Sequence, residues 1–289
     1  MNQLMHKEEE MKTVIKIKKQ LNPMIWILRI IKDLLPISIK VRIVKKLDNL
    51  SSITFNGWGM KTTHELPWNN GIENESFLRA NQDVKEHFEF SGDDGVNLSN
   101  IDGLLWRHWI VSYCMRHAIK FTNEDLEMVE CGVCDGLTAF FALRELRRLS
   151  NRAKMHLYDA WAPMRKEYPL ELEQQSTLRY SNISMQRVKK NLSEFDNIVY
   201  HPGYIPESLH IEPPSPEKIF YLHIDLNSAM PTVAALEHFF PKLARGGVIL
   251  FDDYGWIPYN STKKAVDKFF VDKPGILLPL PTGQAIYYR

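Results

Sequence analysis

The fold of this chain is decided by the segment Glu127–Thr138, which reads EMVECGVCDGLT. Its first five residues form a run of strand length, Gly132 and Gly136 follow, and a helical pattern begins at about Thr138. Two glycines in that position allow a tight turn, in which the backbone approaches a ligand closely before the helix starts. The segment therefore predicts a strand, a glycine turn and a helix, the unit from which open parallel sheets are built.

The alternation of strands and helices extends from about Leu104 to the end of the chain. Runs of strand length lie at 127–131, 155–159, 197–200, 219–225 and 248–252, and helical patterns at 138–149, 184–192, 232–243 and 261–270. This order predicts a parallel α/β sheet with helices on both faces. Two further runs, at 275–280 and 284–288, predict a C-terminal antiparallel hairpin. We therefore expect an open, mostly parallel sheet of seven strands.

The composition is that of an ordinary globular chain, with 289 residues, 44% hydrophobic and 25% charged. A net charge of +1 provides no basic field, so we expect no nucleic-acid partner. Three cysteines are too few for a disulfide framework, and charged residues between Lys7 and Lys12 stand where a secretory signal needs an apolar core. These features predict a cytoplasmic protein.

The first 103 residues have a different character and divide into two parts. Residues 1–50 form a basic amphipathic arm, in which an apolar stripe from Met24 to Leu35 precedes basic residues between Lys40 and Lys46. The arm packs on the main domain or on a second subunit of a homo-oligomer, or residues 23–47 rest on an anionic membrane surface as a peripheral contact. Residues 51–103 show little periodicity, which predicts an irregular covering segment before a domain at 104–289.

Ligands of open parallel sheets bind beyond the carboxyl ends of the strands. The turn at Gly132 and Gly136 follows the first predicted strand, and Asp159 follows the second, where its carboxylate can accept hydrogen bonds from ribose hydroxyls. These positions predict a nucleotide-like ligand that contains adenosine. The dinucleotide pattern Gly-x-Gly-x-x-Gly is absent, which disfavours an NAD-type cofactor.

Three carboxylates follow the fourth and fifth predicted strands. Asp225 ends one strand, and Asp252 and Asp253 end the other. Like charges brought so close raise one another's pKa unless a cation neutralises them, and oxygen ligands favour a hard ion such as Mg²⁺. The sequence therefore predicts a magnesium site formed by Asp225, Asp252 and Asp253.

Two other motifs allow more than one interpretation. The spacing of Cys131 and Cys134 suits a redox dithiol, but the negative charge of Glu130 disfavours a thiolate, and no second pair completes a zinc site. His223 lies two residues before Asp225, on the same side of its strand. It is either a buried structural histidine, which we favour, or part of the site.

Five segments in this order resemble the macrocin O-methyltransferase (TylF-like) family of class I S-adenosylmethionine-dependent enzymes. The resemblance covers about 128–270, and the segments are Glu130–Val133 with Gly136 and Thr138, Tyr158–Trp161, His201–Tyr204 with Ser208 and Leu209, Asp225 with Pro231 and Thr232, and Gly246–Gly255. The fold that this resemblance implies is a Rossmann-like α/β domain behind an N-terminal helical and irregular extension. The implied cofactors are S-adenosylmethionine and Mg²⁺.

The resemblance also implies roles for single residues. Gly132, Val133 and Thr138 would hold the methionine end of the cofactor, with Gly136 in the same turn and Glu130 beneath it. Asp159 would bind the ribose, and Tyr204 would lie near the adenine. Asp225, Asp252 and Asp253 would bind the metal, and Asp225 would also be the catalytic residue that takes the proton from the acceptor hydroxyl.

The function implied is Mg²⁺-dependent transfer of a methyl group to a hydroxyl of a small-molecule or glycan acceptor, namely a sugar, a glycan precursor or a glycosylated natural product. Three alternatives remain: methylation of a phenol or catechol, a non-catalytic module that binds adenosyl ligands, and a nucleotide-dependent oxidoreductase. The chain departs from the family pattern at Cys134, Asp135 and Leu137 in the cofactor loop, and at Asn227, where family members often have a second Asp.

Overall fold

The structure is a computed structural model, and it describes residues 66–69, 71–122, 126–165, 180–256 and 259–289. The predicted arm at 1–50, including residues 23–47, and the first part of the predicted covering segment, 51–65, lie outside the described residues. The described residues from Leu66 to Arg289 belong to one compact unit.

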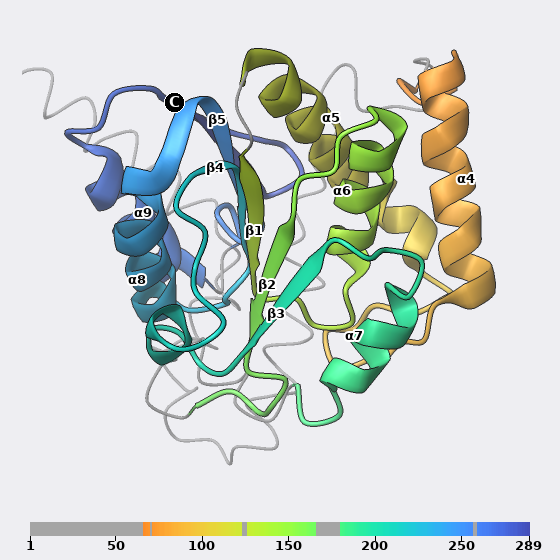
Figure 1. Ribbon diagram of the computed structural model, residues 1–289, viewed down its shortest axis with the longest axis horizontal. Helices are drawn as coiled ribbons and strands as arrows, with labels where there is room; N and C mark the ends of the chain where they lie inside the picture. The colour runs from red at the N-terminus through yellow and green to blue at the C-terminus, as the bar shows by residue number, and fades with distance from the viewer. Residues whose placement is uncertain (1–65, 70, 123–125, 166–179, 257–258) are drawn as a thin grey trace, which may run out of the picture. The chain divides into compact units, whose positions relative to one another are not determined.

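A seven-stranded sheet forms the centre of this unit, with the strand order β3-β2-β1-β4-β5-β7-β6 (Figure 1). Strands β1 to β5 run parallel, and β7 pairs antiparallel with both β5 and β6. The bounds are β1 Glu127–Cys131, β2 Met155–Asp159, β3 Ile198–Pro202, β4 Ile219–Ile224, β5 Leu243–Phe251, β6 Ile276–Pro279 and β7 Ala285–Tyr288. The predicted α/β fold with its C-terminal hairpin is confirmed.

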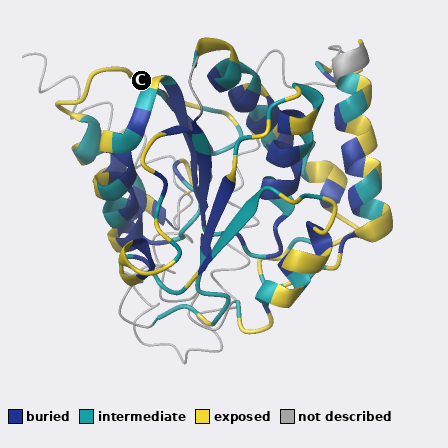
Figure 2. Ribbon diagram, viewed as in Figure 1, coloured by how far each residue is buried: buried dark blue, intermediate teal, exposed yellow. Residues whose placement is uncertain are grey.

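Helices cover both faces of the sheet, as predicted (Figure 1). On one side lie α4 (Ile72–His87), α5 (Leu105–Phe121), α6 (Leu137–Arg148) and α7 (Met185–Asn191), and on the other α8 (Ala229–Phe239) and α9 (Asn260–Phe270). Short 3-10 turns are η2 Ile101–Leu104, η4 Glu207–His210 and η5 Phe240–Lys242. Figure 2 shows that the central strands are buried along most of their length. Two apolar clusters, one on each face, form the core.

Strand β5 begins earlier than the sequence pattern predicts, at Leu243 rather than at 248. The intervening residues are polar or small, so they carry no strand signal. Gly246 adopts φ +84 and donates its N–H to the carbonyl of Arg289 at 3.0 Å, while Arg289 donates to Gly247 at 3.1 Å. These two bonds extend the pairing of β5 beyond its apolar part.

The prediction of an irregular covering segment at 51–103 is wrong for residues 72–87, which form helix α4. Phe77, Ala80 and Val84 are buried on one face of this helix, and Phe77 lies edge-on to Trp109 of α5 at 5.2 Å. Ala80 is too weakly apolar to mark the helical period. Because α4 packs in the same compact unit as the sheet, that unit begins near Leu66 and not at the predicted boundary of 104. Among the described residues, no helix is long and apolar enough to cross a membrane.

Candidate active site

The turn after β1 brings two strand ends into direct contact. Gly132 adopts φ +87, and a Cβ there would lie 1.8 Å from the main-chain oxygen of Asp225. Gly132 donates its N–H to Tyr158 at 2.8 Å, and Asp225 donates to Cys131 at 2.8 Å. A side chain at Gly132 would therefore push the end of β4 away from the end of β1.

Gly136, the second glycine of the turn, makes room for a helix. Gly136 is the N-cap of α6 with φ +86, and a Cβ there would meet Val188 at 3.2 Å and Leu192 at 3.3 Å. Its missing side chain therefore lets α7 approach the start of α6.

Asp159 holds the turn in shape. Its carboxylate accepts main-chain N–H bonds from Val133 at 2.7 Å, Cys134 at 2.9 Å and Trp161 at 2.7 Å. Burial raises the pKa of Asp159, although the three N–H donors favour the ionised form. Because a carboxylate offers about four acceptor positions, room remains for roughly one more donor, such as a ribose hydroxyl.

A pocket of about 760 Å³, including its open mouth, lies over the carboxyl ends of β1, β2, β3 and β4. Nucleotide-like ligands of open parallel sheets bind at this position, beyond the carboxyl ends of the strands. The residues that line it include the predicted Gly132, Asp159, Tyr204 and Asp225. The other predicted cofactor residues are not in its wall: Glu130 is buried below the turn, Val133 contributes its N–H to Asp159, and Gly136 and Thr138 begin helix α6.

Contacts between two loops hold one wall of the pocket, at Tyr204. The Tyr204 hydroxyl donates to the carbonyl of Pro163 at 2.8 Å, and the guanidinium of Arg165 lies 4.1 Å from the centre of the Tyr204 ring. Arg165 also pairs with Glu207. These contacts fix the Tyr204 ring, near which the family resemblance implies that the adenine lies.

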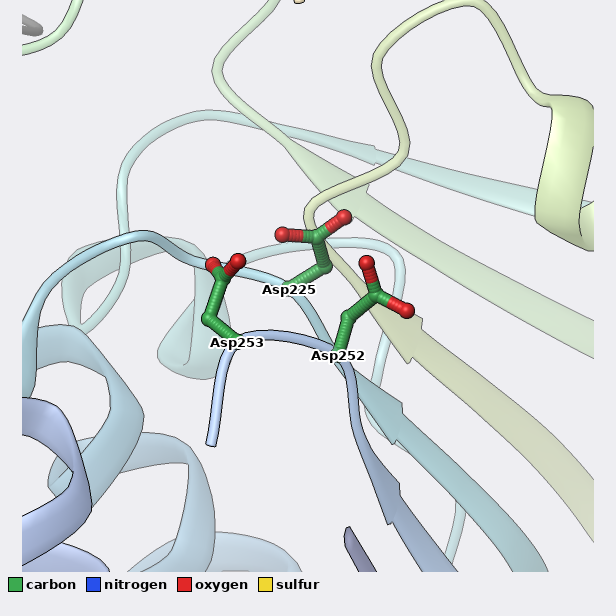
Figure 3. Close-up of side chains that lie close together, drawn as sticks. All are labelled: Asp225, Asp252 and Asp253. Carbon is green, nitrogen blue, oxygen red and sulfur yellow. The ribbon is translucent and has the colours of Figure 1, made fainter. Parts of the chain in front are cut away.

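The three predicted metal ligands gather at the ends of two neighbouring strands, as Figure 3 shows. Asp225 follows β4, whereas Asp252 and Asp253 follow β5. One carboxylate oxygen from each residue lies within 4.8 Å of the other two, and all three residues are half-buried. The predicted convergence of Asp225, Asp252 and Asp253 is therefore confirmed as geometry.

Asp252 is the most firmly held of the three. Its Oδ2 forms an ion pair with Nη2 of Arg107, and its Oδ1 accepts a hydrogen bond from Nε2 of Gln284 at 2.9 Å. Arg107 also donates to the main-chain oxygens of Asp252 and Thr282, both at 3.1 Å. Burial alone would raise the pKa of Asp252, but Arg107 and His223 outweigh it and lower that pKa.

Within the described part of the chain, neither Asp225 nor Asp253 forms such an ion pair with a cationic side chain. Burial and the charge of Asp252 raise the pKa of Asp253 to about 7, and burial together with both neighbouring aspartates raises the pKa of Asp225. Oδ2 of Asp253 is buried and has no hydrogen-bond partner among the described residues. An all-oxygen donor set with an unsatisfied carboxylate oxygen fits a hard divalent cation such as Mg²⁺. These residues could therefore hold that ion.

His223 is buried as the favoured interpretation expects, and it also lies beside a residue of the carboxylate cluster. It is fully buried, its Nδ1 lies 3.4 Å from Oε1 of Glu130, and its Nε2 lies 3.8 Å from Oδ1 of Asp252. Burial works against the charged ring, but Asp252 and Glu130 outweigh it and raise the pKa of His223 to about 10. The ring therefore lies between Glu130 in the core and Asp252 at the site.

The two cysteines of the turn do not favour the redox interpretation. Cys131 and Cys134 are free, and burial raises the pKa of both thiols well above the usual value. Cys131 is enclosed in the core, whereas Cys134 lines the pocket beside Asp94 at 3.7 Å. A thiol held protonated in this way is a poor nucleophile.

Several residues of the site are missed by the sequence analysis. Arg107 comes from the first turn of α5, which is buried on several sides and shows weak helical periodicity, and Asp94 and Tyr180 reach the pocket from irregular segments. Gln284 is isolated in the predicted hairpin. Only Arg107 carried a signal, since it is a basic residue in a mostly apolar stretch.

The strand order and the pocket above the parallel strand ends are those of a class I S-adenosylmethionine-dependent methyltransferase. The family model "Macrocin-O-methyltransferase (TylF)" matches residues 112–289, which is more than half of the chain. The chain therefore belongs to the macrocin O-methyltransferase family, and it is an S-adenosylmethionine-dependent O-methyltransferase.

Two solved structures share the fold of this chain. The O-methyltransferase NovP has a TM-score of 0.62 at 18% identity, and the match covers 75% of this chain and 97% of NovP. The calicheamicin methyltransferase CalS11 has a TM-score of 0.53 at 17% identity, covering 78% of this chain and 94% of CalS11. Among curated proteins, none matches the chain in sequence.

Proposed function

We propose that this enzyme moves the methyl group of S-adenosylmethionine to a hydroxyl of a sugar, a glycan precursor or a glycosylated natural product, and that the reaction depends on Mg²⁺. The sugar is supported by the family, which is described by its action on macrocin, and the metal by the carboxylate cluster. The single observation that carries the proposal is that Asp225 lines the cofactor pocket and also belongs to that cluster.

The cofactor would lie in the pocket between the Gly132 turn and Tyr204. The turn presents main-chain atoms to the methionine end, Asp159 accepts a hydroxyl of the ribose, and the Tyr204 ring covers the adenine. Three main-chain N–H groups already bind the Asp159 carboxylate, and they hold it in a fixed direction. The site is therefore organised before the cofactor arrives, which lowers the entropic cost of alignment.

The acceptor oxygen must lose a proton as its bond to the methyl carbon forms and the bond between that carbon and sulfur breaks. Asp225 would receive the proton, because it lines the cofactor pocket and also belongs to the carboxylate cluster. S-Adenosylhomocysteine leaves with the electron pair of the broken bond, and the proton passes from Asp225 to water. When bound at the cluster, Mg²⁺ would lower the pKa of the acceptor hydroxyl.

Asn227 limits what the site can do. It lies in the pocket with φ +53, and its Nδ2 donates to Oδ1 of Asp225 at 3.1 Å. The amide of Asn227 is not a base. Of these two residues, only Asp225 can therefore take the proton from the acceptor. The amide instead fixes the orientation of the Asp225 carboxylate.

The test is methyl transfer from labelled S-adenosylmethionine to a panel of methyl glycosides, nucleotide sugars and catechol, read by mass. We expect transfer to glycosides that chelator abolishes and Mg²⁺ restores. The Asp225→Asn variant should lose at least about a hundredfold in kcat while it still binds S-adenosylhomocysteine. Transfer to catechol alone would replace the sugar by a phenol, and binding of S-adenosylhomocysteine with no transfer to any acceptor would identify a non-catalytic module.

A further inference from the structure

Trp256 is an aromatic ring held open to solvent beside the carboxylate cluster. Its side chain is 49% exposed, and its main-chain N–H donates to the carbonyl of Asp253 at 3.3 Å, closing a turn directly after the cluster. The ring therefore offers an apolar surface to a ligand directly beside the cluster. The sequence analysis assigned Trp256 no role.

The ring is fixed in place by two loops. The main-chain N–H of Gly255 donates to the carbonyl of Gly283 at 2.6 Å. Gly283 has φ +84, and a Cβ on it would clash with Nε1 of Trp256 at 2.6 Å. The ring edge therefore lies against the backbone of Gly283, and a side chain there would displace it. Fixed aromatic groups bind well because little side-chain entropy is lost.

Arg107 ties this ring to the cluster. Its guanidinium lies 5.7 Å from the centre of the Trp256 ring, while the same group pairs with Asp252 and donates to Thr282. One face of the site is thus an apolar ring, and its rim is made of charged and hydrogen-bonding groups. A pyranose has the matching surface, with C–H bonds on its face and hydroxyls around its edge.

We propose that Trp256 is the acceptor subsite, on which a pyranose ring of the acceptor stacks so that one of its hydroxyls reaches the carboxylate cluster. This inference rests on the proposed function and names how that site recognises a sugar.

Saturation-transfer NMR with a methyl rhamnoside, a methyl glucoside and catechol tests the subsite without any need for turnover. We expect saturation of the ring C–H protons of a methyl glycoside in the wild-type enzyme and in Trp256→Phe. The signal should fall about fivefold in Trp256→Ala, because that variant lacks the ring on which the sugar stacks. Phe121→Ala is the matched control, since Phe121 is 57% exposed but packs beside Gly246 at the opposite end of β5.

The kinetic readout separates this inference from the proposed function. Trp256→Ala should raise KM for the methylated glycoside about tenfold with little change in kcat or in S-adenosylhomocysteine binding. Unchanged glycoside signals and KM in Trp256→Ala would overturn the subsite while sugar methylation stands. Signals from catechol only would also overturn it. Glycoside signals that depend on Trp256, with no methylation of any glycoside, would support the subsite and refute the proposed function.

Discussion

The missing side chain of Gly132 leaves the space that the main-chain carbonyl of Asp225 occupies: a Cβ on Gly132 would lie 1.8 Å from that oxygen. The glycine turn that faces the cofactor pocket and the aspartate of the acidic cluster are therefore packed backbone against backbone. The turn that lines the pocket and the aspartate of the acidic cluster therefore meet at one junction between β1 and β4, so a change at Gly132 should displace Asp225.

This junction predicts that Gly132→Ala damages both sides at once. We expect a loss of stability of roughly 3 kcal/mol, because a positive φ and a steric clash each cost about 1–3 kcal/mol. S-Adenosylhomocysteine binding should be lost in the same variant. Chemical denaturation and calorimetry measure the two effects. Gly95→Ala is the control, since Gly95 has φ +83 but no atom within 4 Å of its Cβ position, and equal losses in the two variants would contradict the junction.

Asp159 should be sensitive to the loss of one oxygen. In Asp159→Asn, an NH₂ group replaces an oxygen that accepts main-chain N–H bonds, so one or two of those donors face another donor. We expect at least about tenfold weaker binding of S-adenosylhomocysteine and a lower Tm. Calorimetric titration gives the affinity, with the exposed Asp196→Asn as control. Wild-type affinity in Asp159→Asn would show that its carboxylate organises neither the turn nor the ribose.

Arg107 should stabilise the cluster when no metal is bound. Removing one partner of a buried ion pair costs about 3–5 kcal/mol, and the Arg107 side chain is only 15% exposed. We expect Arg107→Gln to lower Tm in the presence of chelator and to show a larger gain in Tm on addition of Mg²⁺ than the wild type. Thermal unfolding with and without Mg²⁺ measures this, and Lys85→Gln, at a more exposed pair, is the control. An equal gain in both proteins would mean that Arg107 does not balance the charge of the cluster.

A buried histidine pair predicts how stability depends on pH. Nδ1 of His156 lies 2.8 Å from Nε2 of His201, with Glu127, Lys154 and Lys242 as the charged neighbours, and burial lowers the pKa of both histidines to about 4. In the unfolded chain their pKa is about 6.5, so the unfolded state takes up protons first as the pH falls. The stability that they contribute is present above about pH 6.5 and is lost as the pH falls towards about 4.

Urea denaturation between those two pH values checks this dependence in the wild type and in His201→Phe. Phe retains a ring that can stack on Tyr158, which lies 3.9 Å from the His201 ring, but it removes one titrating group. The free energy of unfolding should fall less steeply with decreasing pH in His201→Phe. The exposed His87→Gln variant should follow the wild type, and the same slope in all three proteins would assign the acid sensitivity to other groups.

The parallel strands were predictable because both their period and their ends are local. The bounds of β1 and β2 follow directly from the sequence, and Asp225, Asp252 and Asp253 were placed together because neighbouring parallel strands end at one edge of the sheet. Contacts from outside this pattern were not predictable. Arg107 and Trp256 act through loops and a helix whose periodicity is weak, and the partners of Asp252 depend on where α5 packs.

The predicted cofactor turn shows the same limit. The sequence grouped Gly132 and Gly136 as one ligand-binding feature, but their spacing does not reveal what each missing side chain makes room for. Gly132 faces Asp225, whereas Gly136 faces Val188 and Leu192 of the neighbouring helical turn. The glycine motif predicts that the backbone packs closely against another group. Only the tertiary structure shows which residue that group belongs to.

Calorimetric titration of Mg²⁺ into the enzyme saturated with S-adenosylhomocysteine tests the central claim most directly. With the aspartate cluster as the metal site, one Mg²⁺ binds per chain, and Asp253→Asn, which alters the unpartnered Oδ2, weakens that binding at least about tenfold. Asp267→Asn, at an exposed pair on α9, should bind as the wild type does. No heat of binding in the wild type, or the same affinity in Asp253→Asn, would contradict the claim that these carboxylates hold a divalent cation beside the methyl donor.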